Sequence, residues 1–152
     1  MPATSIDGVR VANFTDLDAT TLYELLRLRV DVFVVEQQCP YPELDGRDIE
    51  PTTRHLWLPD PERAGSALAY LRLLAEPDQT VRIGRVAVAL RARGAGLARR
   101  LMPAALALVY QRTCVLDAQS QLVDFYQQYG FRPTGPEYLD DGIPHVPMRR
   151  ER

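Results

Sequence analysis

Apolar and polar positions follow two different periods along the chain, and together they predict a fold of mixed helices and strands. Residues 19–36, 96–110 and 119–129 have the 3.6-residue period of helices that pack one face on a core. Thr15 and Asp18 are candidate caps for the first helix. Its stripe is mostly apolar, with Arg29 at the edge, and consists of Leu22, Leu25, Leu26, Arg29, Val30, Phe33 and Gln37.

Two further residues bear on where the later helices begin and end. Pro103 lies inside the second helix and predicts either a kink or a later start, because proline removes an N–H and clashes one turn back. Gly130 stands at the C′ position that ends the third helix.

The remaining apolar runs are short, rich in β-branched residues and bounded by turn residues, as expected for strands. They are residues 9–14, 55–58, 66–74, 80–89, 114–117, 131–133 and 145–149. The proline-rich and acidic segment 39–51 predicts an irregular loop. The order is an early helix, an antiparallel run and then a β-α-β-α unit, whose helical crossover requires a parallel pair of strands. The chain is therefore expected to have a mixed α+β fold.

Composition narrows the class of protein. The 152 residues suit a single domain spanning residues 1–152, and 46% hydrophobic with 25% charged residues is ordinary for a soluble globular chain. The net charge of -2 gives no reason to expect nucleic-acid or membrane binding. We find no signal peptide or spanning segment, and we expect a cytoplasmic protein. The two cysteines and two histidines are isolated, so no metal site is expected.

A glycine-containing turn at residues 91–96 carries the most chemical information. It joins the strand 80–89 to a helix, whose first N–H groups have no internal partner and favour an anion such as phosphate. Nearby positive charge comes from Arg91, Arg93, Arg99 and Arg100. A simple strand-to-helix turn that binds no ligand is one alternative. A Rossmann site is a further one, since Asp117 ends the next strand, although Arg99 occupies the third glycine position.

The turn resembles the acetyl-CoA signature of the GNAT superfamily, [Q/R]-x-x-G-x-[G/A], at every fixed position from Arg91 to Gly96. About thirty residues later, Phe125 to Phe131 matches the F-Y-x-x-x-G-F helix of the same family. Segments 28–29, 32–41, 45–46 and 141–145 are similar to the ElaA group within it. The resemblance covers nearly the whole chain. It implies a mostly antiparallel sheet of about six to seven strands, splayed into a V and flanked by helices.

The resemblance also implies a set of residues that bind acetyl-CoA. The turn's amides would hold the pyrophosphate, and the strand before it would pair with the pantetheine arm. The set is Val86, Ala87, Val88, Arg91, Arg93, Gly94, Ala95, Gly96, Leu97, Ala98, Arg99, Gln119 and Tyr126. No metal is implied.

For catalysis, the resemblance makes Tyr126 the acid that protonates the departing thiolate, although a buried tyrosine with a locally satisfied hydroxyl is the alternative. Many members place a glutamate on the strand before the turn, where this chain has Gly84 and Arg85. His145 and Glu36 are the first candidates for a base. Asp45 and His55 also remain open. A structural role for His145 and a bracing role for Glu36 are the alternatives, and the acids of the loop 39–51 either attract a cationic amine or are simply solvated.

These observations predict an acetyl-CoA-dependent N-acetyltransferase that acts on a primary amine of a small molecule or peptide. Cys39 and Cys114 are poorly placed as nucleophiles, which favours direct attack in a ternary complex. The alternatives are a non-catalytic acyl-CoA-binding or regulatory module and a Rossmann-like nucleotide-binding protein. The acceptor, the preferred acyl group and the choice between monomer and homodimer stay open.

Overall fold

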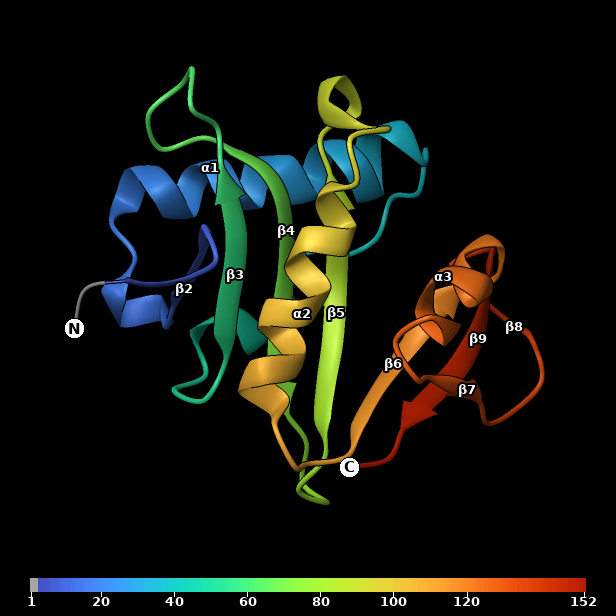
Figure 1. Cartoon of the computed structure of the whole chain (residues 1–152). Helices are drawn as coiled ribbons and strands as arrows, with labels where there is room; N and C mark the ends of the chain where they lie inside the picture. Colours follow the sequence, from blue (N-terminus) through green and yellow to red (C-terminus); the bar gives the residue numbers. More distant parts are fainter. Residues whose placement is uncertain (1–2) are drawn as a thin grey trace.

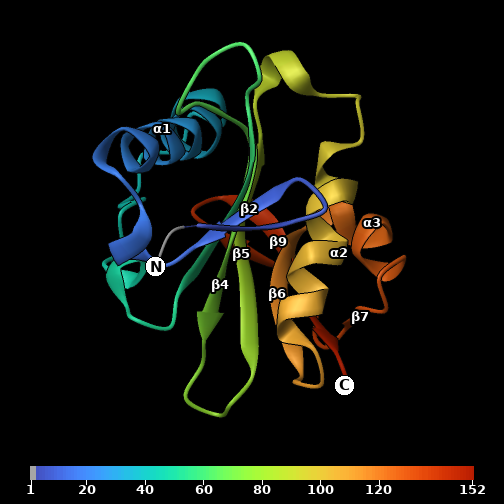
Figure 2. The same cartoon turned by 60° about the vertical axis from the view of Figure 1, so that its left-hand side comes forward.

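The computed structural model describes residues 3–152, which form one nine-stranded sheet with helices on both faces (Figures 1 and 2). The strands are β1 (Thr4–Ile6), β2 (Val9–Ala12), β3 (Arg54–Pro59), β4 (Ala67–Ala75), β5 (Val81–Val88), β6 (Cys114–Gln119), β7 (Arg132–Pro133), β8 (Tyr138–Asp140) and β9 (Ile143–Arg150). They lie in the order β1-β2-β3-β4-β5-β6-β9-β7, and β8 also pairs with β9. Only the β5–β6 pair is parallel within the described residues, which confirms the predicted mixed sheet with a single crossover.

The sheet has more strands than the six or seven expected, because two short hairpins were missed. Asp7 and Gly8 join β1 to β2, and Asp141 and Gly142 join β8 to β9. All four residues have positive φ, between 49° and 84°. That is the backbone of a two-residue type I′ turn, for which Asp-Gly is a preferred sequence. The Asp-Gly dipeptides were therefore a readable signal for both hairpins.

The first long helix follows its predicted course from Ala19 to Glu36, but its last turns differ. α1 (Ala19–Val30) is α-helical and continues directly into η2 (Asp31–Glu36), which has π-helical geometry. Asp18 caps α1 as predicted, since its carboxylate accepts a hydrogen bond from the Thr21 amide at 2.7 Å. Thr15 is not a cap and lies instead in the 3₁₀ turn η1 (Phe14–Asp16).

The remaining helices are α2 (Leu97–Val109), α3 (Val123–Gln127) and the 3₁₀ turns η3 (Arg47–Ile49), η4 (Leu90–Ala92) and η5 (Ser120–Leu122). α2 begins where predicted and runs through Pro103, which lies on its exposed face. The helix predicted over 119–129 is shorter, because β6 extends to Gln119. α3 ends at Gln127, with Gln128 as its C-cap, so Gly130 does not hold the predicted C′ position and lies instead in the turn that follows, with a φ of 89°.

Alternation along the central strands places two apolar cores on opposite faces of the sheet. Leu56, Leu58 and Leu71 face α2 in one core, and Trp57 and Tyr70 face α1 in the other. Figure 2 shows the sheet standing between α1 and α2. No helix within residues 3–152 is long and apolar enough to span a bilayer.

Candidate active site

The sheet parts between its two parallel strands, and this parting creates the main cleft. β5 and β6 pair only at Val81–Cys114 and Arg82–Val115. Beyond these pairs the strands diverge, so that β6, β7, β8 and β9 form a separate arm with α3 (Figure 1). The resulting cleft has a volume of about 620 Å³. It is lined by both diverging strands, by the turn before α2, by α3 and by the end of η2.

β5 carries a bulge where it borders the cleft. Tyr70 of β4 pairs with Ala87 and Arg72 pairs with Gly84, so that Arg85 and Val86 together lie opposite a single residue. Arg85 has a φ of 55°, which is uncommon for a residue with a side chain. A bulge bends its strand and disturbs the regular ladder. The edge of β5 that faces the cleft, from Gly84 to Val88, lies beyond the two β5–β6 pairs and therefore has no paired strand there. The bulge also changes the local direction of this edge.

The turn before α2 opens into the same cleft. Gly94 and Gly96 have φ values of 84° and 73°, and a Cβ added at Gly94 would meet nothing within 4 Å. Gly96 is the N-cap of α2 and offers no side chain to the first helical amides. Those amides have no partner inside the helix. Residues Leu97, Ala98 and Arg99 line the cleft, so donors and open space lie together where an anionic group such as a diphosphate fits.

The arginines of the turn point in different directions. Arg91 forms an ion pair with Asp60 at 2.8 Å, away from the cleft. Ala95 also lies outside the cleft lining. Arg93 lines the cleft, but it donates to both carboxylate oxygens of Glu36, at 2.5 and 2.7 Å. Arg99 lines the cleft, is exposed and forms no ion pair within the described part of the chain.

Tyr126 lies in the wall that α3 contributes. Its side chain is 5% exposed and packs edge-on against Phe125 and Phe131. Tyr126 lines the cleft, and its hydroxyl has no hydrogen-bond partner among residues 3–152 and is not among the fully buried atoms, so it is open to a ligand. Burial raises the pKa of Tyr126 to about 12, so the phenol keeps its proton at neutral pH. The local hydrogen bond expected of a purely structural tyrosine is missing.

The two predicted base candidates lie in the cleft in different states. Arg93 lowers the pKa of Glu36 by its hydrogen bonds and charge, so this carboxylate is a weaker base than a free glutamate. His145 lies opposite Gln119 in the β6–β9 ladder. Its Nδ1 is 2.7 Å from the carbonyl of Ile143, which can only accept, so Nδ1 carries the proton. The Nε2 lone pair of His145 is therefore available.

Both cysteines are held as thiols. Cys39 donates to the carbonyl of Asp141 at 3.3 Å, and burial together with the acids Asp141 and Asp140 raises its pKa. Burial raises the pKa of Cys114 to about 12. A thiolate nucleophile is disfavoured at both positions. Within residues 3–152, no group of three or more histidine, cysteine or acidic side chains is placed to hold a metal.

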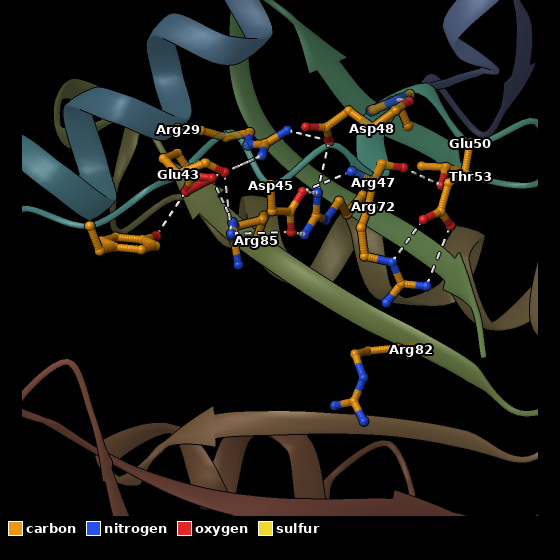
Figure 3. Close-up of polar contacts among 12 residues, drawn as sticks. Arg29, Glu43, Asp45, Arg47, Asp48, Glu50, Thr53, Arg72, Arg82 and Arg85 are labelled. Atoms are coloured by element: carbon orange, nitrogen blue, oxygen red, sulfur yellow. Dashed lines mark hydrogen bonds and ion pairs between the residues drawn. The ribbon is translucent and has the colours of Figure 1, made fainter. Parts of the chain in front are cut away.

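A cluster of buried charges supports one wall of the cleft (Figure 3). Arg29 is fully buried between α1 and the loop and binds Glu43 at 2.8 Å and Asp48 at 2.6 Å. Arg72 binds the same Asp48 at 2.9 Å and Asp45 at 2.5 Å. Below, the charge cluster means Arg29, Glu43, Asp45, Asp48, Arg72 and Arg85.

The charge cluster corrects two expectations. Arg29 is not at the edge of the helix stripe but inside the protein, because two carboxylates neutralise its charge there. Two acids of the loop are likewise not solvated, since Glu43 and Asp48 are 4% and 6% exposed. Asp45 and His55, the other base candidates, lie outside the cleft lining. His55 is buried, contacts the Tyr70 hydroxyl at 2.7 Å, and has a pKa lowered by that burial.

Some cleft residues escaped the sequence reasoning. Arg85 extends from the bulge over the ring of Tyr41, with its guanidinium carbon 5.7 Å from the ring centre, and binds Glu43 at 2.6 Å. Arg82 reaches across the parting to Asp117 of β6, at 2.6 Å. The readable signal was the charge inside apolar strands: Arg72 interrupts a buried run, and such a residue needs carboxylate partners.

A mixed sheet that parts at its parallel pair and receives a helix N-terminus in the opening is the fold of the GNAT acyl-CoA N-acyltransferases. Solved structures agree. The crystal structure of ElaA from Escherichia coli superposes with a TM-score of 0.86 at 37% identity, covering 94% of this chain and 98% of that one. An acyl-CoA N-acyltransferase from Pseudomonas aeruginosa gives 0.83 at 44% identity, with coverage of 93% and 98%.

Sequence comparison gives the family. Residues 53–152 match the family described as acetyltransferase (GNAT) domain. A UPF0039 protein of Mycobacterium tuberculosis is 55% identical over 89% of this chain and 87% of its own length. The ElaA protein of Escherichia coli is 40% identical over 90% and 92%. The chain belongs to the GNAT acetyltransferases and, within them, to the group formed by ElaA and the UPF0039 proteins.

Proposed function

We propose that this protein is an N-acetyltransferase that moves the acetyl group of acetyl-CoA directly to a primary amine in a ternary complex. The observation that carries the proposal is the cleft itself. It brings the unpartnered amides at the start of α2, the unpaired edge of β5 and the Tyr126 ring into one cavity. A structure solved at 12% identity, an aminoglycoside 6′-N-acetyltransferase complexed with coenzyme A, has the same fold with a TM-score of 0.68.

Coenzyme A would bind along the two strands and the turn. The amides of Leu97, Ala98 and Arg99 suit its diphosphate, and Val86, Ala87 and Val88 offer a backbone edge to the pantetheine arm. Gln119 faces them from β6. Arg91 leaves the proposed set because it is bound to Asp60, and Ala95 leaves it because it lies outside the cleft.

In the proposed reaction the acetyl thioester supplies an activated acyl group, and the residues of the chain manage the protons. A C–N bond forms, a C–S bond breaks, the amine loses a proton and the sulfur gains one. Tyr126 keeps its proton and borders the cleft, which suits donation to the sulfur. His145 offers a lone pair at Nε2 for the proton of the amine, whereas both oxygens of Glu36 are bound to Arg93.

Two rival functions fare differently. A Rossmann-like nucleotide-binding protein needs a mostly parallel sheet, and this sheet has one parallel pair among its described strands, so that alternative is wrong. A non-catalytic acyl-CoA-binding module would have the same turn and strand edge. It differs only in having no productive acceptor.

The test combines binding with turnover. We expect calorimetry to show coenzyme A binding to the folded protein, and an amine panel to include acceptors that release free thiol from acetyl-CoA. Binding without thiol release across polyamines, small amines and peptide amines would support the regulatory module instead. A folded protein that takes up no coenzyme A would refute both.

A further inference from the structure

The turn between β5 and α2 has little buried packing of its own apart from Ala92, which is half-buried against both cores. Ala89 and Leu97, at its two ends, are each 9% exposed, but Leu90 between them is 71% exposed and residues 93–96 are exposed throughout. Ion pairs hold the turn on two sides instead. Arg91 binds Asp60 on one side, and Arg93 binds Glu36 on the other.

Arg93 joins three segments through one guanidinium group. Nη1 and Nη2 donate to the two oxygens of Glu36 at 2.5 and 2.7 Å, while Nε and Nη2 donate to the carbonyl of Val88 at 3.1 Å each. Glu36 is the last residue of η2, and Val88 is the last residue of β5. Figure 1 shows this turn beside the end of the first helix. A bidentate pair of this kind fixes direction as well as distance.

This arrangement leaves neither partner free for another role. Both carboxylate oxygens of Glu36 are engaged, so the group is poorly placed to accept a proton from an amine. Arg93 has spent most of its donors inside the protein, which makes it a poor direct ligand for phosphate. What the pair does provide is a fixed path for the backbone that continues through Gly94 and Gly96, where the wide conformational range of glycine would otherwise allow other paths.

We propose that Glu36 is a positioning residue that acts through Arg93, holding the turn so that the amides at the start of α2 are already aimed at the diphosphate of coenzyme A. The inference rests on the proposed function. Its physical basis is preorganisation: a loop ordered before binding does not have to be ordered during binding, which strengthens affinity without a new contact. Glu36 thereby supports cofactor binding from the end of η2.

The test is a double-mutant cycle on coenzyme A binding, with Glu36→Gln, Arg93→Gln and the double variant measured by calorimetry. We expect Glu36→Gln to weaken binding about fivefold, the upper range for a partly exposed ion pair. The same change should have little further effect once Arg93 is replaced. Both side chains are more than a third exposed, so the variants should fold, and thermal unfolding checks this.

Glu50→Gln is the matched control. Glu50 also binds an arginine, Arg47, through both oxygens, at 3.1 and 3.4 Å, and it has the same 38% side-chain exposure as Glu36. It lies outside the cleft lining, so its loss should leave coenzyme A affinity unchanged. A merely structural ion pair would give the same result at Glu36 as at Glu50.

Turnover separates positioning from base catalysis. If Glu36 positions the turn, Glu36→Gln raises KM for acetyl-CoA, and the pH profile of kcat keeps its shape. A fall in kcat of about 10²-fold or more with unchanged coenzyme A affinity would identify a base and overturn the inference. So would wild-type affinity in Glu36→Gln. If the wild type itself bound no coenzyme A, the proposed function would fail and this inference with it.

Discussion

Tyr126 has two properties that suit a proton donor: its hydroxyl lacks an internal hydrogen-bond partner among the described residues, and the residue borders the cleft. Because this hydroxyl is accessible and has no internal partner, it can form its hydrogen bond with a bound ligand. Its pKa of about 12, against roughly 10 for a free tyrosine, keeps the proton in place at every pH where the protein would work.

Replacing Tyr126 by phenylalanine removes the proton donor and little else, because the ring remains to pack on Phe125 and Phe131. We expect kcat to fall about 10²-fold, the low end for general acid catalysis, with coenzyme A affinity retained. Steady-state kinetics with a chemistry-limited acceptor measures this. Tyr129→Phe serves as the control, since that residue packs on Phe125 outside the cleft lining. Equal kcat in both variants would remove Tyr126 from the acid role.

Among the elements, α2 is a helix that contains a proline in its interior. Pro103 lies within the helix, where proline deletes a backbone hydrogen bond, yet the helix continues to Val109. Leu101, Met102, Ala104 and Ala105, on either side of it, are buried on the sheet, so tertiary packing outweighs the local penalty. Pro103 itself faces outward and contributes nothing to that packing.

Pro103→Ala is therefore expected to stabilise the protein. The substitution restores one helical N–H and loses no buried surface, and we expect a gain of about 1–3 kcal/mol in the free energy of unfolding. Urea denaturation measures it. Ala107→Gly on the same exposed face should destabilise by about 1 kcal/mol. A proline variant no more stable than the wild type would contradict this expectation.

The elements also show what the sequence could and could not predict. Long periodic segments such as α1, β4 and β5 were predicted correctly, because burial on one face imposes a period on the residues. The glycine turn and the Tyr126 helix were found through motifs. The charge cluster was not, because the partners of Arg29 are 14 and 19 residues away in an irregular loop, and no periodicity connects them. The bulge at Arg85 likewise leaves no local signature.

Across the molecule, the charge cluster ties the loop to α1, β4 and β5, and so it couples stability to pH. Burial alone would raise the pKa of Asp48, but its bonds to Arg29 and Arg72 lower it overall. A depressed folded-state pKa stabilises the protein above the unfolded value of about 3.9 and loses that contribution as the pH falls below it. Arginine keeps its own charge throughout this range.

We therefore expect the free energy of unfolding to be steady near neutral pH and to fall steeply below about pH 4. Asp48→Asn should cost about 3 kcal/mol or more at pH 7, because it leaves buried arginines short of a partner. The substitution should also make the free energy of unfolding depend less on pH below about pH 4. Urea denaturation between pH 7 and pH 3 gives both values, and Glu151→Gln, at an exposed pair, is the control. If the free energy of unfolding fell equally with pH in Asp48→Asn and in the wild type, Asp48 would not be the source of the pH dependence.

The β5–β6 pairing is short, so the two parts of the sheet on either side of it share few backbone hydrogen bonds. Past Arg82 and Val115, no backbone ladder among the described strands resists a small rotation of the part that holds β6 and β9. The cleft can therefore widen for a bulky ligand while each part of the sheet keeps its internal hydrogen bonds. Amide hydrogen exchange should report this as lower protection at the Val81–Cys114 and Arg82–Val115 pairs than within the β6–β9 ladder.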